Sequence, residues 1–435
     1  MSDWIKGFLA DEIASLDAGV SVNAEDKPHG AGEFGVLKTS AVSGGRFYAN
    51  QNKTVVEQEI HLLAEPVQGD SILVSRMNTP ALVGESCYVK EAQPTLFLPD
   101  RLWQLKPKDR TRLSMRWLSF VLQSEFYRRH VEVHATGTSG SMKNLPKSKL
   151  LALTVTYPDP AEQSDIAEVL DTLDNAVAQT EAIIAKLKAV KQGLLHDLLT
   201  RGIDANGELR PSQSEAPQLY KPSALGWIPR EWNVSSIEST TTNSVIGPFG
   251  SDLVASDYRE SGVPVVFVRD VKPNRINWIS NVYVSPQKAT RLAAHEVCPG
   301  DVVATKMGFP PCIAAVYPDS LPNGIVTADI VRLKVARDKV RSRWLAYSMN
   351  SWAVAKQVEK ITAGVTRPKV TLRDVRDLEI CVPSLTEQDV ILARLEALEA
   401  RSHQEECELE KLTKAKTGLL DDLLTGNVRV TALLG

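Results

Sequence analysis

One block of this chain occurs twice, at residues 158–200 and again at residues 383–425, and the copies align without a gap. The first closes with Gly-Leu-Leu-His-Asp-Leu-Leu-Thr (193–200) and the second with Gly-Leu-Leu-Asp-Asp-Leu-Leu-Thr (418–425). Tandem units of a solenoid repeat every 20–50 residues or so, and copies this far apart indicate a duplicated domain instead. The chain is therefore predicted to have internal two-fold pseudosymmetry, which suits a nearly two-fold partner such as duplex DNA.

Each copy predicts one long helix. Apolar residues recur at steps of three and four, from Ile166 to Leu198 in the first copy and from Ile391 to Leu423 in the second. Such spacing over several heptads is typical of a coiled coil. Two copies in one chain can pair with each other antiparallel; a coiled coil that dimerises or trimerises the protein is the alternative.

The ends of both helices are marked by capping residues. Ser384 and Glu387 predict a capping box, and Asp159 with Glu162 repeats the pattern. A glycine follows each helix where a left-handed residue is favoured, at Gly202 and Gly426.

The charge is partitioned along the chain. The whole chain has a net charge of −3, yet each repeated block carries −5 and the remainder therefore +7. Residues 231–382 hold 19 basic and 15 acidic side chains. Acidic helices thus flank mildly basic domains, which gives modest support to nucleic-acid binding.

Cysteine use and hydropathy indicate a cytoplasmic protein without a membrane span. The five cysteines are scattered and form no Cys-x-x-Cys pair, as expected of reduced thiols. No apolar run approaches the length of a membrane-spanning helix, and the N-terminus lacks the pattern of a signal peptide.

The segments before the two helices also match one another. Gly69-Asp70 aligns with Gly300-Asp301, and Trp117 aligns with Trp344. Each segment predicts short strands, a helix (about 111–131 and 340–361), a glycine-containing loop and a last apolar strand. Both tryptophans are expected in the core, and the polar segment between the halves is expected to be an exposed crossing.

The sequence predicts no catalytic site and no metal site. It has no phosphate-binding Gly-x4-Gly-Lys-Ser/Thr loop and no Gly-x-Ser-x-Gly elbow. Gly308-Phe-Pro-Pro311 is interpreted as a turn. His130 and His134 could share a helix face, but no third ligand is evident and the Val-Glu-Val between them is more typical of a strand.

Three segments resemble the conserved regions of type I restriction–modification specificity subunits. They are residues 186–204 (Lys-Leu-Lys-Ala-Val-Lys-Gln-Gly-Leu-Leu-His-Asp-Leu-Leu-Thr-Arg-Gly-Ile-Asp), 207–211 (Gly-Glu-Leu-Arg-Pro) and 225–232 (Leu-Gly-Trp-Ile-Pro-Arg-Glu-Trp). The similarity covers nearly the whole chain. The N-terminal domain departs from it, because no Leu-Gly-x-Ile-Pro segment precedes Trp4.

The resemblance implies an α+β fold in which two pseudo-repeated mixed α/β DNA-recognition domains are separated by two long helices, packed as an antiparallel coiled coil. The expected parts are recognition domain 1 (1–157), helix 1 (158–202), a linker (203–221), recognition domain 2 (222–382), helix 2 (383–426) and a tail (427–435).

The resemblance also implies a division of labour. This chain would read a bipartite target in double-stranded DNA and scaffold two methyltransferase subunits, without catalysis or a cofactor of its own. Those subunits would carry S-adenosylmethionine and methylate adenine N6, and separate motor-nuclease restriction subunits would cleave unmodified DNA. A coiled-coil adaptor without a DNA role is the competing hypothesis, and a module of a single-chain restriction enzyme is a third.

Candidate DNA contacts lie on strand-end loops and the glycine loops. Arg and Asn suit bidentate reading of guanine and adenine, and Lys mostly neutralises phosphate. The candidates are Lys38, Ser40, Arg46, Arg76, Asn78, Ser139, Lys143 and Asn144 in the first domain, and Arg269, Lys272, Asn274, Arg275, Lys306, Thr366, Arg367 and Lys369 in the second.

Paired leucines near the helix ends are the candidate protein-binding surface. They make an apolar face wider than a two-helix seam needs, which predicts a third surface packed there. They are Leu194, Leu195, Leu198, Leu199, Leu419, Leu420, Leu423 and Leu424. Over-packing of the helix pair itself is the alternative.

Overall fold

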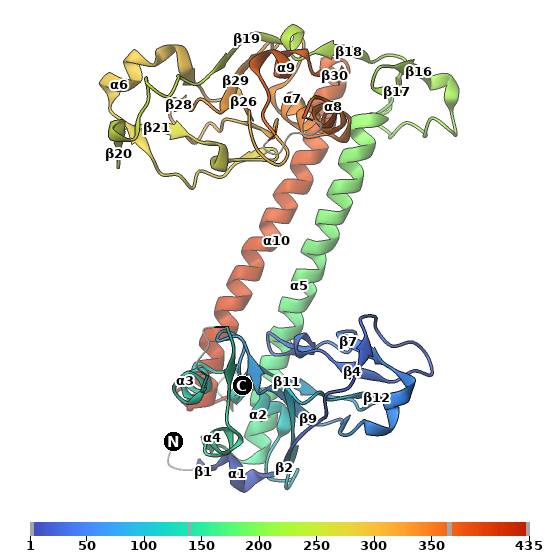
Figure 1. Cartoon of the computed structure of the whole chain (residues 1–435), viewed down its shortest axis with the longest axis vertical. Helices are drawn as coiled ribbons and strands as arrows, with labels where there is room; N and C mark the ends of the chain where they lie inside the picture. The colour runs from blue at the N-terminus through green and yellow to red at the C-terminus, as the bar shows by residue number, and fades with distance from the viewer. Residues whose placement is uncertain (1–3, 138–140, 363–367, 432–435) are drawn as a thin grey trace. The chain divides into compact units, whose positions relative to one another are not determined.

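The chain forms two compact units, each made of segments that are far apart in the sequence. The computed structural model describes residues 4–137, 141–362 and 368–431. The first unit comprises Met1–Ala182 and Glu406–Gly435, and the second comprises Ile183–Glu405. Each unit therefore holds one mixed α/β domain and a stretch of each long helix (Figure 1). Among the described residues, none of the helices combines the length and apolarity needed to cross a bilayer.

The two long helices are α5 (Pro160–Thr200) and α10 (Leu385–Thr425), each of 41 residues. In the first unit Ile166 of α5 joins the core that holds Leu423 of α10. In the second unit Leu198 shares a core with Ile391 and Leu395. Residue numbers rise along one helix and fall along the other, so the stretches within each unit are antiparallel, as predicted (Figure 1).

The first domain holds a four-stranded sheet in the order β11-β9-β13-β2 and a five-stranded sheet in the order β3-β7-β4-β12-β8. The strands of the first sheet are β2 (Ile13–Ala18), β9 (Ser71–Ser75), β11 (Ser86–Val89) and β13 (Leu102–Pro107). The strands of the second are β3 (Ala24–Glu25), β4 (Gly35–Leu37), β7 (Asn52–Val55), β8 (Pro66–Val67) and β12 (Gln93–Phe97). All five residues of β9 are buried, because this short apolar strand lies between two others.

The second domain repeats this arrangement. Its four-stranded sheet runs β27-β26-β29-β19, and its five-stranded sheet runs β20-β24-β21-β28-β25. The former comprises β19 (Thr241–Ile246), β26 (Val302–Thr305), β27 (Ala314–Val316) and β29 (Ile330–Val335). The latter comprises β20 (Tyr258–Arg259), β21 (Val263–Val266), β24 (Tyr283–Val284), β25 (Glu296–Val297) and β28 (Gly324–Val326). A parallel pair occurs in each five-stranded sheet, β12–β4 and β21–β28, so the predicted duplication extends to the sheet topology.

The helix predicted in each domain is in fact two helices. They are α2 (Met115–Val121) and α3 (Glu125–His134) in the first domain, and α7 (Ser342–Met349) and α8 (Trp352–Thr362) in the second. The Ser124 side chain accepts the Tyr127 N–H and starts α3 after a turn, which the apolar periodicity did not reveal. The expectation of a strand around residues 131–133 was wrong, since they belong to α3.

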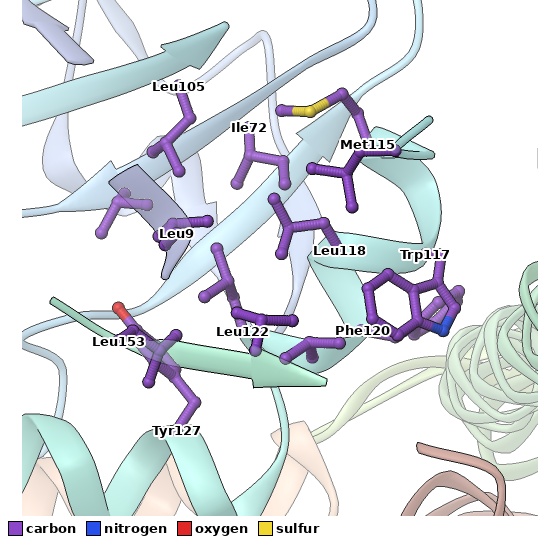
Figure 2. Close-up of a cluster of buried hydrophobic side chains, with 14 of the residues drawn as sticks. Leu9, Ile72, Leu105, Met115, Trp117, Leu118, Phe120, Leu122, Tyr127 and Leu153 are labelled. Carbon is purple, nitrogen blue, oxygen red and sulfur yellow. The ribbon is translucent and has the colours of Figure 1, made fainter. Parts of the chain in front are cut away.

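Both predicted core tryptophans are fully buried. Trp117 and Trp344 are 0% exposed. Figure 2 shows Leu118 of α2 pointing toward Ile72 of the sheet, in the core that also holds Trp117. The indole of Trp344 donates to the carbonyl of Cys381 at 2.9 Å.

Short elements join these layers. They are the helices α1 (Leu9–Glu12), α4 (Lys147–Leu151), α6 (Pro286–Arg291) and α9 (Leu372–Asp377), and the paired strands β1 (Ile5–Phe8) with β15 (Thr154–Tyr157), β18 (Asn233–Ser236) with β30 (Glu379–Val382), β5 (Val42–Ser43) with β6 (Arg46–Phe47), β22 (Val271–Lys272) with β23 (Arg275–Ile276), β10 (Met77–Asn78) with β14 (Lys143–Asn144), and β16 (Tyr220–Ser223) with β17 (Gly226–Pro229).

A buried glutamine near the start of α5 holds the helix to its domain. Gln163 Oε1 accepts the Ser114 N–H at 2.8 Å, and Nε2 donates to the carbonyls of Arg112 (3.0 Å) and Pro158 (2.9 Å). The side-chain amide thus satisfies two backbone groups just before α2 and one just before α5, which burial would otherwise leave unpaired.

The second unit repeats the arrangement at Gln388. Its Oε1 accepts the Arg341 N–H at 2.8 Å, and its Nε2 donates to the carbonyls of Lys339 (3.2 Å) and Pro383 (3.0 Å). The two glutamines occupy the same position of the repeated block, and they dock two domains by the same three hydrogen bonds.

The glutamate beside each glutamine does not close the predicted capping box. The cap oxygens are as expected, since Ser384 Oγ accepts the Glu387 N–H (3.2 Å) and Asp159 Oδ1 accepts the Glu162 N–H (3.0 Å). The glutamate side chains point elsewhere. Glu162 accepts the Trp4 indole N–H at 3.3 Å and pairs with Arg429 Nε at 3.1 Å.

Glu387 forms the matching anchor in the second unit. It accepts the Trp232 indole N–H (3.1 Å) and the Ile203 backbone N–H (2.9 Å), and it pairs with Arg210 Nη1 at 2.5 Å. Trp4 therefore occupies the place of Trp232, although no Leu-Gly-x-Ile-Pro segment precedes it. Arg429 of the tail occupies the place of Arg210 of the linker.

The linker is partly buried and hydrogen-bonded, whereas the sequence predicted an exposed segment. Ile203 and Leu209 form a β-bridge, and Ile203 and Tyr220 are buried. Gly202 adopts φ +63 and Gly426 φ +69, the left-handed conformation predicted for both helix ends.

Replacing Arg210 with Met should sharply destabilise the second unit. Both side chains of the Arg210–Glu387 pair are at most 10% exposed, and removing one partner of a buried ion pair typically costs about 3–5 kcal/mol. Urea denaturation followed by tryptophan fluorescence would measure the loss. Arg373→Met is the matched control, because the Arg373–Asp377 pair is exposed (91% and 64%) and should contribute almost nothing. Equal shifts for both variants would contradict the anchor role.

Candidate nucleic-acid interface

The predicted contact residues do not form one cluster in either domain. Each domain instead presents a group beside the strand that follows the Gly-Asp turn, and a second group on a hairpin beside a long helix. Three candidates, Ser139, Thr366 and Arg367, lie outside the described residues.

In the second domain the first group centres on two lysines. Met307, two residues beyond the end of β26, forms a β-bridge with Lys369, so Lys306 and Lys369 lie on neighbouring segments. Lys369 Nζ pairs with Asp329 at 3.3 Å, and Lys306 Nζ donates to the Ala328 carbonyl at 3.2 Å. Burial and the charge of Lys369 lower the pKa of Lys306, against the opposing effect of Asp329. The Asp329 carboxylate is thus the one negative charge described near the ammonium groups of Lys306 and Lys369, and a bound phosphate would balance the second positive charge.

A hollow of about 500 Å³ lies next to these lysines. Its lining residues include Met307, Asp329, Arg269 and Phe267. Arg269 stacks over the Phe267 ring at 4.7 Å, and its Nε donates to Ser280 Oγ at 2.6 Å. Arg269 therefore lines a partly apolar hollow, and Lys306 and Lys369 contact Ala328 and Asp329, which also line it.

The equivalent place in the first domain carries arginine and asparagine. Met77 pairs with Asn144, as Met307 pairs with Lys369, so Arg76 and Asn144 correspond to the two lysines. The Arg76 guanidinium lies 5.5 Å from the Trp103 ring. Arg76 Nε and Asn144 Oδ1 are buried, and neither atom has a hydrogen-bond partner among the residues that the structure describes. Buried polar atoms without a partner are rare in folded proteins, which marks both side chains as candidates for a further contact.

The neighbouring candidates are held by contacts within the first domain. Lys143 Nζ donates to the Gly137 carbonyl at 3.0 Å, and Asn78 Nδ2 donates to Ser75 Oγ at 3.2 Å. Lys38 pairs with Asp26 at 2.8 Å, and the hydroxyl of Ser40 donates to Gln51 at 3.0 Å.

The hairpin candidates lie beside a long helix, which the sequence did not predict. Arg46 pairs with Glu181 of α5 at 2.6 Å. Arg275, on the corresponding hairpin, lines a hollow with Glu399 of α10. Asn274 adopts φ +62 and accepts a hydrogen bond from Asn350 Nδ2 (2.8 Å), so its amide stabilises the hairpin turn. The remaining candidate, Lys272, precedes this turn on β22.

Ion pairs missed by the sequence analysis tie each domain to both helices. In the second unit Arg343 of α7 pairs with Glu399 (2.5 Å) and Glu396 (3.2 Å) of α10, and Lys191 of α5 pairs with Glu399 at 2.7 Å. Burial alone would raise the pKa of Glu399, but hydrogen bonds from Lys191 and Tyr347 and the charge of Arg343 hold this pKa below its ordinary value.

The first unit has the same network. Arg116 of α2 pairs with Asp171 and with Asp174 (3.4 Å) of α5, and Lys416 of α10 pairs with Asp174 at 2.5 Å. One sequence feature could have indicated these ion pairs. Lys191 and Lys416 interrupt the apolar seams at equivalent positions of the two copies.

The leucines predicted to bind a partner pack mainly against the chain's own domains. Leu198 and Leu423 are 0% exposed and Leu420 is 8% exposed, so these three have almost no surface to offer, which corrects the prediction for them. The third surface implied by the wide apolar face is the adjoining domain core. The remaining five are partly buried: Leu194, Leu195, Leu199, Leu419 and Leu424.

The histidine pair lies on α3, one turn apart. Its rings are 4.3 Å apart, and His130 Nε2 contacts the Lys149 carbonyl at 2.8 Å. In the described part of the chain, no group of three His, Cys, Asp or Glu side chains is arranged to hold a metal ion.

Several known proteins are similar to this chain in sequence or in fold. The model of the type I restriction modification DNA specificity domain matches residues 1–189 and 323–414. A Methanocaldococcus jannaschii protein assigned as the type I restriction enzyme MjaX specificity subunit is 23% identical over 359 residues, which is 82% of this chain and 78% of that protein. The MjaVIII specificity subunit of the same organism is 23% identical over 286 residues, covering 65% and 63%. The crystal structure of the type I restriction–modification S subunit from M. genitalium has a TM-score of 0.58 at 15% identity, covering 97% of this chain and 96% of that one.

Replacing Lys369 with Ala should weaken binding to all DNA sequences by a similar factor. If its ammonium group neutralises a phosphate, the slope of log K against log salt should become shallower by about 1. Fluorescence anisotropy on specific and random duplexes at several salt concentrations would measure the slope. Lys356→Ala is the control, because Lys356 pairs with Glu359 on α8 and should leave the slope unchanged. An unaltered slope for Lys369→Ala would remove this lysine from the interface.

Proposed function

Because the chain belongs to the type I restriction–modification DNA specificity family, we propose that it selects the DNA sequence on which such a complex acts, by reading one half of a bipartite target with each domain. The observation that carries this proposal is a shared scaffold with different polar groups at one place. Arg76 and Asn144 stand in the first domain where Lys306 and Lys369 stand in the second. Two domains of one topology that carry different side chains at this place suit a target whose halves differ in sequence.

The chemistry of these groups supports direct reading in the first domain. Arginine reads guanine and asparagine reads adenine through paired hydrogen bonds in the major groove. The lysines of the second domain suit phosphate contacts that fix its position on the duplex. The hairpin residue Arg275 was predicted to contact bases, but its place beside Glu399 favours a role at the helix.

The chain performs no catalytic step in this proposal. Two methyltransferase subunits would bind it, carry S-adenosylmethionine and methylate adenine N6, and motor-nuclease restriction subunits would join them to cleave unmodified DNA. These partners would meet this chain in the cytoplasm. Support for assembly comes from a fold neighbour (TM-score 0.56, 15% identity) whose study concerns complex assembly and conformational transition of a type I restriction–modification system. The alternative of an adaptor without a DNA role has no support, because the matched family model is a DNA specificity domain.

Replacing Arg76 with Ala should relax one position in one half of the target. The lost bidentate contact should cost about 1–3 kcal/mol of discrimination. The chain would be co-expressed with its methyltransferase subunits, and modified adenines would be mapped at base resolution. Arg110→Ala is the control, because Arg110 is 63% exposed and pairs with Asp70 away from Arg76. An unchanged motif for Arg76→Ala would exclude base reading by this residue, and a complex that modifies DNA without sequence preference would refute the proposed function.

Charging Leu199 and Leu424 together, by Leu→Asp, should prevent methyltransferase assembly while the chain stays folded. The two leucines are equivalent and only partly buried, so each can contact both its own core and a partner. Co-purification would report assembly, and circular dichroism would report folding. Leu62→Asp is the control at a leucine that is 47% exposed. Intact assembly, or unfolding of the double variant, would count against a partner-binding role.

A further inference from the structure

Two phenylalanines of the second domain are unusually exposed. Phe309 is 81% exposed and Phe249 is 73% exposed, far more than the aromatic residues that fill the core. Large apolar side chains that gather on an otherwise polar surface commonly mark a binding site. The two belong to loops that border the same hollow, since Pro248, Gly250 and Met307 all line it.

Both loops are anchored to the four-stranded sheet. The Gly247 N–H donates to the Ile330 carbonyl at 3.2 Å, and the Cys312 N–H donates to the Thr305 carbonyl at 2.7 Å. At Gly247 an added Cβ would lie only 2.1 Å from the Thr327 backbone, so this close approach requires glycine. The phenylalanines therefore project from short turns fixed on β19, β26 and β29.

The first domain has the same two loops without the aromatic residues. Gly19 follows β2 as Gly247 follows β19, and each of these glycines packs against the backbone of a facing segment. Ser21 stands two residues beyond Gly19, where the second domain has Phe249. Thr79 stands two residues beyond Met77, where the second domain has Phe309 beyond Met307. Because the scaffold is shared, neither phenylalanine is needed to form its loop.

The charge around the phenylalanines indicates what they bind. Arg269 lines the same hollow, and Lys369 and Lys306 contact two of its lining residues, Asp329 and Ala328. Among the described lining residues, Asp329 is the one carboxylate. A surface that combines cations with exposed aromatic rings fits a ligand with phosphates and flat bases. A protein partner would need no such cluster of cations.

We propose that Phe309, supported by Phe249, inserts between base pairs of the second half-site and unstacks one step of the duplex. This inference rests on the proposed function and assigns to the two domains different ways of reading DNA. The first domain reads base edges through Arg76 and Asn144. The second domain selects a step that is easily unstacked, and pyrimidine–purine steps such as TA and CA/TG are the easiest to deform.

The test uses the chain assembled with its methyltransferase subunits. Duplexes of the modified motif would carry 2-aminopurine at successive positions of each half-site, outside the methylated adenines, and its fluorescence rises when a base is unstacked. The second half-site should show a rise at one step, and the first half-site should show none. In the Phe249→Ala/Phe309→Ala variant the rise should disappear. Affinity for the specific duplex should fall about 5- to 150-fold, because a base–aromatic stack contributes about 1–3 kcal/mol.

The control is Trp227→Ala/Trp352→Ala, which removes two other aromatic side chains of this unit that are 53% and 65% exposed. It should leave both the fluorescence rise and the affinity unchanged. A wild-type complex with no rise in the second half-site, or a rise that persists in the phenylalanine variant, would overturn the inference and leave the proposed function intact. Loss of the methyltransferase subunits from the phenylalanine variant would instead make this surface a protein contact. If the wild-type complex binds specific and random duplexes equally, the proposed function itself fails.

Discussion

The structure depends on a glutamate and a glutamine that stand side by side at the start of each long helix. Gln163 and Gln388 are completely buried, and each binds two backbone groups of its own domain and the carbonyl of the proline before its helix. The adjacent glutamates bind an indole and a guanidinium that arrive from other parts of the chain. Burying a carboxylate or amide is costly unless it is paired, so each glutamate and glutamine depends on these partners. The domain, the helix and the segment beyond the other helix are thereby fixed together.

This requirement explains why each unit contains equivalent partners for its glutamate, although they come from different parts of the chain. The linker supplies Arg210 and the start of the second domain supplies Trp232 to Glu387, whereas the tail supplies Arg429 and the N-terminal segment supplies Trp4 to Glu162. Each unit therefore uses both long helices, and the ion pairs of Lys191 and Lys416 reinforce that use. A recognition domain cannot dock on one helix alone without leaving buried charges unpaired.

Two copies of one scaffold leave the surface free to diverge. The glycines, tryptophans and helix-start residues that build both domains are repeated. The groups at the candidate interface are not, since arginine and asparagine in the first domain correspond to lysines in the second, and serine and threonine correspond to phenylalanines. Packing restricts the former residues, whereas the less buried positions at the candidate interface are restricted mainly by what they bind. This separation is what a family of proteins that read different sequences requires.

The sequence by itself determined the duplication, the two long helices and their ends, and the buried tryptophans, because helical periodicity, caps and repeated motifs are local signals. The family was indicated by the resemblance of residues 186–204, 207–211 and 225–232 to its conserved regions. The sequence also identified the residue types that suit DNA. Only the tertiary structure decided which of them stand together, that Arg46 and Asn274 serve the scaffold, and that three of the leucines fill the chain's own core. The sequence predicted the helix-start glutamates only as caps, because a local pattern does not reveal distant partners. Their observed partners are Trp4, Trp232, Arg210 and Arg429, all far from each glutamate in the sequence. Contacts at such separations depend on topology, which no local pattern encodes.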